Sequence, residues 1–588
     1  MLYLTLEKQL HAAVEAIAPG ADLSDLQVRP CAEAKFGDYQ CNLMTLARRL
    51  QRPPRPFAEE VKGRLDVGRW CEAVELAGAG FLNFRLHPEA MAAELQQAAG
   101  GGGLFFRPAE KPKTVVVDFS SPNVAKPMHV GHIRSTILGD SLARILRVLG
   151  HRVITDNHLG DWGTQFGKLL LGWKQKLTPE QRQRVTIDDL ERLYKEVNAA
   201  CEADAAQLEA ARQELVKLQQ GDPENLGIWQ RMIELSRAEF DAVYQRLGVR
   251  FDYTLGESFY NPFLKQVVQE LLERGIARES DGAVCVFSDG TLPPKEDPFL
   301  IQREGGWVPN PCLILKSDGA ANYATTDLAT LDYRWRTWRP DEIVYVTDGR
   351  QQLHFRQVFA VFRRWQPEAA AHMRLAHVWF GSILGEDGRP FKTRSGDTIR
   401  LSELLDEAEE RALAVVNQKN PDLPQDERRR IARVVGVGAV KYADLLPNRQ
   451  SDYVFSWDKM LSLQGNSAVY LLYAYARIRS IFRKGAEQGV TVEGAGSVRL
   501  ETAEERALAR HLLNFGLVLR IAAEEYRPNY LCNYLYDLAG LFARFFEQCP
   551  VLKSEPAVRA SRLTLCDLTA RVLRQGLEVL GIETLEQI

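Results

Sequence analysis

Residues 115–156 constrain the fold of this chain more than any other segment. An apolar run at 115–119 is followed by a polar loop, and then by apolar residues at helical spacing up to Leu149. Gly150 is placed to end that helix, and a second apolar segment follows at 152–156. Strand, helix and strand in this order predict a βαβ unit that binds a ligand at the loop after its first strand.

The loop of this unit, residues 120–132, carries groups that suit a polyanion. The N-terminus of the helix offers unpaired N–H groups and a partial positive charge, and Gly131 leaves room for a ligand to approach the backbone. Lys126, His129 and His132 add donors on the same side. Neither usual glycine-rich phosphate signature occurs in the chain. A nucleotide triphosphate fits this pattern, although two histidines at a helix start can equally cap the helix or bind a structural metal.

The longer string at residues 118–136, DFSSPNVAKPMHVGHIRST, resembles a known enzyme family. Its H-V-G-H at 129–132 is similar to the H-I-G-H signature of class I aminoacyl-tRNA synthetases. Four loosely defined positions match many chains by chance, but within that class the longer string is similar only to the arginyl-tRNA synthetases, of the bacterial type. The resemblance extends over essentially the whole chain, module by module.

Composition sets the broad class of the protein. The chain has 588 residues, enough for several domains, and a net charge of −3, which argues against a general nucleic-acid coat but allows one partner with local contacts. Its nine cysteines are scattered without a C-x-x-C pair, so they indicate neither a disulfide framework nor a zinc knuckle. No apolar run approaches roughly 18 residues, and the N-terminus lacks signal-peptide order. We therefore expect a cytoplasmic protein without a membrane span.

The pattern of elements, together with the resemblance, predicts an α/β architecture with three functional parts. These are a small α/β N-terminal domain that contacts the elbow of the tRNA, a Rossmann-like class I synthetase catalytic domain with a polar helical insertion, and an α-helical C-terminal anticodon-binding domain. Further strands of the catalytic domain are expected at 283–287, 312–316, 342–346 and 378–384. The expected limits are 1–105 for the N-terminal domain, 106–400 for the catalytic domain with its insertion at about 170–250, 401–455 for a helical connection and 456–588 for the C-terminal domain.

A second candidate site surrounds Tyr323 and Asp327. These residues are four apart, so a helix places them on one face. A phenol and a carboxylate that converge suit a guanidinium group, although an acidic first turn is also common at helix starts. The resemblance implies that this string recognises arginine. It also implies that Asp118 helps to bind the guanidinium, that Ser121 and Asn123 hold the α-amino and carboxylate end, and that Gln351 joins them.

The segment 388–396 lies where class I enzymes carry the K-M-S-K-S signature. Its two signature lysines fall on Pro390 and Thr393, so that signature is absent. The resemblance implies that Lys126, just before H-V-G-H, substitutes for the missing lysine. Two cations of this segment are further candidate ATP contacts: Lys392 and Arg394.

Aromatic and arginine side chains alternate in two C-terminal segments, 470–483 and 530–546. Such stripes can stack unpaired bases, but they are more often helix core. The resemblance implies that this region binds the anticodon.

The implied reaction joins L-arginine to tRNA(Arg) with ATP, bound as its Mg²⁺ complex, and releases AMP and pyrophosphate. Lys126, His129 and His132 are the expected catalytic residues, and Gly131 is expected to contact ATP. We expect no protein-bound metal or zinc, no editing domain, no membrane partner, and a monomer.

Three alternatives stay open. One is another class I synthetase, of which a cysteinyl enzyme would want a zinc site. Another is a metallohydrolase that uses His129, His132, His151 and His158; the last of these otherwise packs in a loop or contacts nucleotide. The third is a catalytically silent tRNA-binding relative.

Overall fold

The computed structural model describes the chain except residues 32, 102, 392–397 and 491–496. Two compact units are present. The first unit combines Met1–Ala109 with Val415–Leu446 and Asp458–Ile588, and the second combines Glu110–Ala414 with Pro447–Trp457. The domain limits expected from the sequence stay predictions, because the first unit groups both ends of the chain.

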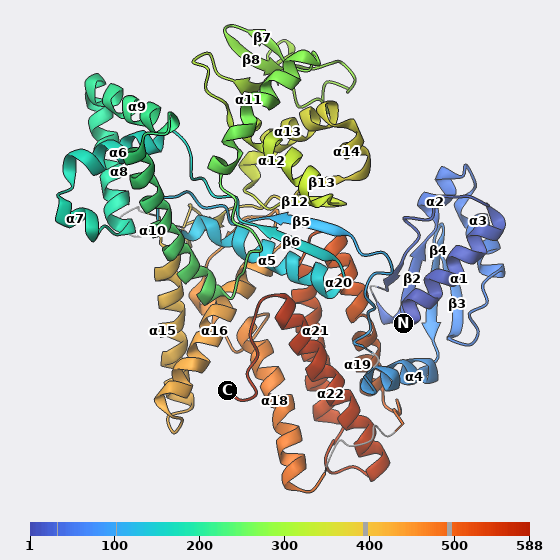
Figure 1. The fold of residues 1–588 in the computed structure, drawn as a ribbon. Helices are drawn as coiled ribbons and strands as arrows, with labels where there is room; N and C mark the ends of the chain where they lie inside the picture. Colours follow the sequence, from blue (N-terminus) through green and yellow to red (C-terminus); the bar gives the residue numbers. More distant parts are fainter. Residues whose placement is uncertain (32, 102, 392–397, 491–496) are drawn as a thin grey trace. The chain divides into compact units, whose positions relative to one another are not determined.

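A parallel sheet organises the second unit (Figure 1). Its order is β13-β12-β5-β6, and its strands are β5 (Thr114–Asp118), β6 (Arg152–Asp156), β12 (Glu342–Tyr345) and β13 (Arg374–His377). All three strand pairs are parallel. The predicted βαβ unit is confirmed, since α5 (Ile133–Val148) joins β5 to the neighbouring β6. The loops after β5, β6 and β12 consequently meet at one edge of the sheet.

Burial explains why β5 occupies the middle of this sheet. Val115, Val116 and Val117 are all buried, as expected for a strand covered on both faces. The helix packs closely on it, because a Cβ added to Gly139 of α5 would lie 2.2 Å from Cγ of Phe119. Gly150 has a φ of 87° and ends the helical segment as predicted.

Three of the other four strand predictions are confirmed as strands, although two of these strands belong to another sheet. The segment 342–346 corresponds to β12, but β8 (Ala283–Val286) and β11 (Cys312–Leu315) belong to a separate antiparallel sheet with β7 (Arg278–Ser280), in the order β11-β8-β7. The segment 378–384 is not one strand, since only β14 (Ile383–Leu384) is extended there, and it pairs with β15 (Tyr453–Val454). A short apolar run reveals a strand but not its partner.

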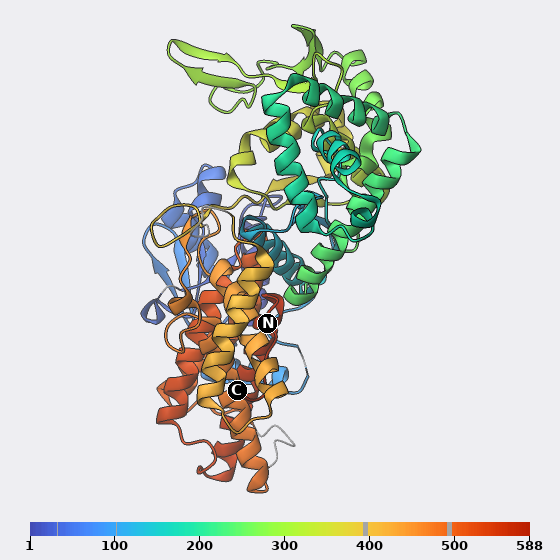
Figure 2. The same ribbon diagram turned by 90° about the vertical axis from the view of Figure 1, so that its left-hand side faces the viewer.

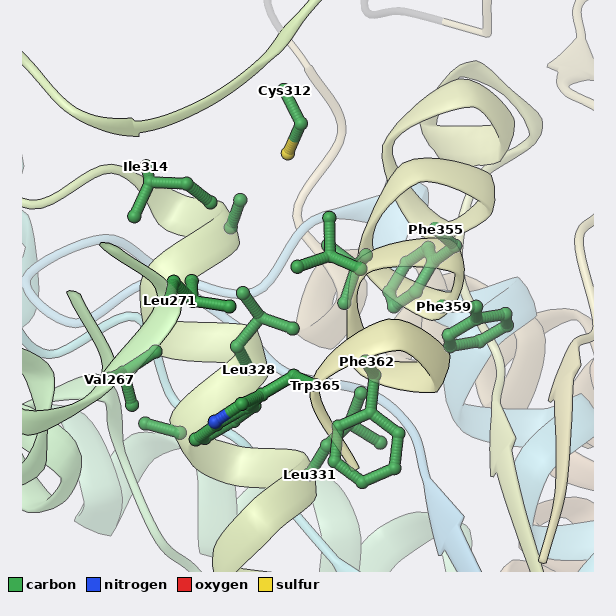
Figure 3. Close-up of a cluster of buried hydrophobic side chains, with 14 of the residues drawn as sticks. Val267, Leu271, Cys312, Ile314, Leu328, Leu331, Phe355, Phe359, Phe362 and Trp365 are labelled. Carbon is green, nitrogen blue, oxygen red and sulfur yellow. The ribbon is translucent and has the colours of Figure 1, made fainter. Parts of the chain in front are cut away.

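A hydrophobic core lies beneath the helices that carry the second candidate site (Figure 3). It packs α11 (Glu257–Glu273), α12 (Tyr323–Trp338) and α13 (Gln352–Trp365) against β11. Leu271, Leu328, Phe362 and Trp365 are among its buried side chains. This core holds α12 and α13 in one arrangement, and with them the side chains at their N-termini.

The expected insertion is helical. It comprises α6 (Gln165–Lys176), α7 (Pro179–Gln183), α8 (Ile187–Ala203), α9 (Ala205–Gln219) and α10 (Pro223–Leu247). The spacing of apolar residues in this segment favours an antiparallel helix pair. In the structure, however, α6, α8 and α9 pack on one another and α10 contacts all three. Elsewhere in this unit a hairpin of β9 (Leu300–Arg303) and β10 (Gly306–Pro309), yellow-green in Figure 2, projects outward.

The first unit contains an antiparallel sheet, β1-β2-β4-β3, and a set of C-terminal helices. The sheet strands are β1 (Val28–Pro30), β2 (Tyr39–Asn42), β3 (Cys71–Ala77) and β4 (Phe81–Leu86), and the helices beside them are α1 (Leu2–Ile17), α2 (Met44–Arg49), α3 (Pro54–Gly63) and α4 (Pro88–Ala99). The C-terminal helices are α16 (Gln425–Leu445), α18 (Ala468–Glu487), α19 (Ala503–Leu513), α20 (Phe515–Glu524), α21 (Asn529–Gln548) and α22 (Pro556–Val579). α15 (Leu401–Lys419) carries the chain from the second unit to the first.

Side-chain contacts join the two parts of the first unit. Arg520 of α20 donates to both carboxylate oxygens of Glu7 in α1, at 2.8 and 2.6 Å. The aromatic stripe divides between core and surface: Tyr534 and Phe545 are buried, whereas Tyr473 is 50% exposed. No helix among the described residues is both long and apolar enough to cross a bilayer.

Candidate active site

The imidazoles of both histidines of H-V-G-H accept backbone hydrogen bonds at the start of η2 (Val130–His132). The N–H of Gly131 donates to Nδ1 of His129 at 3.0 Å, and the N–H of His129 donates to Nδ1 of His132 at 3.1 Å. Because each Nδ1 accepts a hydrogen bond, the proton of each neutral imidazole lies on Nε2. The capping alternative is therefore correct, and it leaves two Nε2–H donors for a ligand.

Lowered pKa values favour the neutral form of both imidazoles. Burial, with help from the neighbouring His129, lowers the pKa of His132 from 6.5 to about 3. Burial and the positive charge of Lys126 also lower the pKa of His129. The histidines are thus hydrogen-bond donors, and the positive charge of this loop comes from Lys126, an exposed residue whose Nζ lies 4.7 Å from the ring centroid of Tyr194 in α8.

Gly131 has a structural reason to be glycine. A Cβ at this position would lie 2.7 Å from Cε1 and 2.9 Å from Nδ1 of His129. The capping imidazole of His129 therefore occupies the space on the Cβ side of Gly131, which the sequence suggested for a ligand.

The loop between β5 and η2 is held in an unusual backbone conformation. Ser120 and Ser121 have φ values of 74° and 50°, which non-glycine residues rarely adopt. The Ser120 hydroxyl lies 2.7 Å from the hydroxyl of Tyr244, and the N–H of Ser121 donates to Oδ1 of Asn157 at 3.0 Å. These bonds fix the segment that leads to Asn123, an exposed side chain.

Asp118 already binds a guanidinium of the protein itself. Its Oδ2 accepts from Arg334 at 2.5 Å, and the same nitrogen donates to Asp156 at 2.8 Å. Arg334 is fully buried, and its guanidinium lies 5.2 Å from the ring centroid of Tyr345. The other Asp118 oxygen accepts from the hydroxyl of Ser121 at 3.2 Å. Neither Arg334 nor Asp156 was predicted from the sequence, although Arg334 is seven residues beyond Asp327 on the same helix.

The N-terminal turns of α11 and α12 bring together the carboxylates of Glu257 and Asp327, with His354 of α13 beside them. These three side chains are called the Asp327 group. α12 begins at Tyr323, so Tyr323 and Asp327 share a face as predicted, and Tyr323 is 68% exposed. Asp327 Oδ2 lies 2.5 Å from Nε2 of His354. Gln351 is exposed at the end of η3 (Gly349–Gln351), directly before α13.

Two pKa shifts describe the charge of this group. Burial, and then the negative charges of Asp327 and Asp161, raise the pKa of Glu257 to about 8. Burial lowers the pKa of His354, but its hydrogen bond to Asp327 and the charge of that carboxylate outweigh burial, so the pKa is raised. A positively charged ligand would favour the ionised form of Glu257 and the neutral form of His354.

The structure describes residues 388–391 of the second signature loop, 388–396, and the chain before and after it. Lys392, Thr393 and Arg394 lie outside the described residues. Upstream, the N–H of Phe391 donates to the carbonyl of Ile383 at 3.1 Å. Downstream, the N–H of Val130 donates to Ile399 at 2.9 Å and that of Leu401 to Met128 at 2.9 Å. The chain that leaves this loop is consequently paired with the H-V-G-H segment.

The four histidines of the hydrolase alternative do not converge. His151 directly precedes β6 and accepts from the N–H of Lys113 at 3.2 Å, whereas His129 and His132 follow the opposite, carboxyl end of the aligned β5. His158 packs on the ring of Tyr260, with centroids 5.5 Å apart. In the described part of the chain, no group of three or more histidines, cysteines or acidic residues is arranged for a metal ion.

Comparison with known proteins matches most of the chain to three family models. Residues 4–86 match the arginyl-tRNA synthetase N-terminal domain, residues 95–457 the catalytic domain of class I tRNA synthetases for arginine, and residues 471–588 the DALR anticodon-binding domain. The arginine–tRNA ligase of Hahella chejuensis is 46% identical, with 99% of each chain covered. That of Escherichia coli is 44% identical over 100% of this chain and 99% of its own.

Solved structures agree with these matches. The arginyl-tRNA synthetase of Plasmodium falciparum is 29% identical and superimposes with a TM-score of 0.81, covering 100% of this chain and 99% of the other. The arginyl-tRNA synthetase of Thermus thermophilus, 26% identical, gives the same TM-score of 0.81 with 100% of both chains covered. The resemblance of the H-V-G-H string is confirmed, and this chain belongs to the arginyl-tRNA synthetases of class I.

Proposed function

We propose that this protein activates L-arginine with ATP and transfers the arginyl group to the 3′ end of tRNA(Arg). The observation that carries the proposal is the shared sheet edge: the capped H-V-G-H follows β5, and the Asp327 group lies at the helix starts around β12. One part offers donors and a cation for phosphates, and the other offers carboxylates for a guanidinium.

In the first step the arginine carboxylate attacks the α-phosphate of ATP in line, and pyrophosphate leaves. Such a reaction needs positioning and charge stabilisation more than covalent chemistry. We assign this task to Lys126 and to the Nε2–H donors of His129 and His132, with the backbone at Gly131 beside them. Lys392 and Arg394 are proposed as further ATP contacts, and Mg²⁺ accompanies ATP as part of the substrate.

The arginine side chain is proposed to lie between α12 and α13. Asp327 accepts the guanidinium, Tyr323 and Gln351 contribute polar contacts, and Ser121 and Asn123 hold the α-amino and carboxylate end. Asp118 is proposed to contribute through the oxygen that faces Ser121, since its other oxygen binds Arg334. A site with carboxylates for a guanidinium rejects amino acids that leave them unpaired, by roughly 10⁴–10⁵, so no separate editing activity is required.

In the second step a terminal ribose hydroxyl of the tRNA attacks the adenylate, and AMP leaves. We propose that the N-terminal sheet domain and the C-terminal helices bind the tRNA, and that the protein acts as a cytoplasmic monomer. All nine cysteines are free thiols, which suits a reducing compartment.

Pyrophosphate exchange with each of the twenty amino acids, with and without tRNA, tests the proposal. We expect exchange with arginine only, and only when tRNA is present. Exchange with another amino acid would favour another class I synthetase, and tRNA binding without any exchange would favour a silent relative.

A further inference from the structure

The helical insertion contacts the segment of Lys126 at two points. The Nζ of Lys126 lies 4.7 Å from the ring centroid of Tyr194 in α8. The N–H of Ala125, the preceding residue, donates to the hydroxyl of Ser236 in α10 at 2.9 Å. Ala125 has a φ of 64°, a strained conformation for a non-glycine residue, so this bond helps to hold the backbone from which Lys126 projects. Both the backbone and the side chain of this segment are therefore held by the insertion.

The same face of α8 contacts the chain that leaves the second signature loop. Arg400 donates to Asp188 at 2.5 Å and to Glu191 at 3.1 Å. Asp188, Glu191 and Tyr194 follow one another at three-residue spacing, so they lie along one side of the helix. Arg400 is also opposite His129 in an antiparallel bridge. This face of α8 thus contacts Lys126, which lies just before H-V-G-H, and also Arg400, which is paired with His129.

An aromatic partner has a particular advantage for this lysine. A carboxylate would neutralise the ammonium and compete with a phosphate for its donors. The face of a ring attracts the charge without accepting a strong hydrogen bond, so the N–H groups stay available to a ligand. It also limits the conformational freedom of a long side chain that would otherwise lose entropy when it binds the phosphate.

We propose that Tyr194 is a positioning residue for Lys126, and that the insertion takes part in catalysis through this contact. The inference rests on the proposed function, because it requires that Lys126 acts on ATP. Tyr194 itself contacts neither substrate; its ring holds the ammonium near the position where the phosphates bind.

Two substitutions of Tyr194 separate the ring from its hydroxyl. Tyr194→Leu removes the aromatic face and should lower kcat for aminoacylation roughly 3- to 30-fold, the range that loss of a cation–π contact allows, with KM for arginine unchanged. Tyr194→Phe keeps the face and should retain nearly the full kcat. Arg192→Ala is the matched control, since Arg192 lies on α8 but pairs with Asp189 within the helix; it should behave as wild type. Thermal unfolding of each variant checks that the insertion folds.

Lys126→Ala, alone and combined with Tyr194→Leu, tests separately whether Lys126 acts in turnover and whether Tyr194 acts through Lys126. We expect Lys126→Ala to lose most of its turnover and the added Tyr194→Leu to cost nothing further. A wild-type kcat in Tyr194→Leu, an equal loss in the Phe and Leu variants, or a further loss in the Lys126→Ala background would overturn the inference while leaving the proposed function intact. Normal turnover in Lys126→Ala would overturn the assignment of Lys126 itself.

Discussion

His354 places its Nε2 2.5 Å from Oδ2 of Asp327, so the carboxylate proposed to bind the substrate guanidinium has a titratable partner. Asp327 raises the pKa of His354 above 6.5 despite burial. Protonated His354 neutralises Asp327, whereas neutral His354 leaves its negative charge to the substrate. The affinity for arginine should therefore rise as the pH increases through the raised pKa of His354. The stabilising effect of the pair on the fold has the opposite sign: it is present at low pH and is lost over the same rise.

Arginine titrations across the neutral pH range, in the wild type and in His354→Gln, check this expectation. Glutamine cannot become cationic, so the variant should bind arginine with a flatter pH profile; the remaining slope would come from Glu257, whose pKa is about 8. An unchanged slope in His354→Gln would assign the pH dependence to other groups.

Asp327→Asn should weaken arginine binding while ATP binding persists. Loss of a hydrogen bond between charged groups corresponds to a roughly 10- to 100-fold increase in KM for arginine. Asp332→Asn is the control on the same helix, because Asp332 pairs with Arg336 on α12. Similar changes in both variants would point to a general effect on α12.

Gly131→Ala should lower turnover through His129. The added Cβ would lie 2.7 Å from Cε1 of that imidazole, so the ring must move away from its capping position. If the displaced donor is lost to the transition state, kcat falls roughly 10²-fold. Gly227→Ala in α10 is a suitable comparison, since nothing lies within 4 Å of its added Cβ; steady-state kinetics with normal turnover in Gly131→Ala would contradict the capping argument.

His132 should stay neutral well below its usual titration range. Its pKa is lowered from 6.5 to about 3, and its Nδ1 accepts from the backbone. Nitrogen-15 NMR of the imidazole should therefore report the Nε2-protonated tautomer in mildly acidic solution. Titration near the ordinary histidine pKa would show that the ring is less buried than the structure indicates.

Local sequence patterns predicted the βαβ unit, the helical insertion and the shared face of Tyr323 and Asp327, because strand, helix and spacing are properties of neighbouring residues. They did not predict which sheet the segments 283–287 and 312–316 join, since strand partners are chosen by packing across the whole domain. The contacts of Arg334 were missed for the same reason: it is 178 residues from Asp156 in the chain.

Both the sequence and the structure were needed to assign roles to His129 and His132. Their spacing suggested either a cap or a nucleotide site, and only the positions of the hydrogen bonds show how one arrangement can serve both purposes. His354 gave no signal in the sequence beyond its place after Gln351, because its partner Asp327 belongs to another helix.

The buried Arg334 limits how the specificity of this enzyme can be redesigned. A variant intended for an uncharged amino acid would have to remove acidity around Asp118, yet that carboxylate and Asp156 are also the counter-ions of an internal cation that solvent cannot reach. Removing Asp118 alone takes away one of the two counter-ions of Arg334, and breaking a buried ion pair typically costs about 3–5 kcal/mol of folding free energy. Engineering toward neutral substrates should therefore exchange Asp118, Asp156 and Arg334 together, as a single volume-matched replacement.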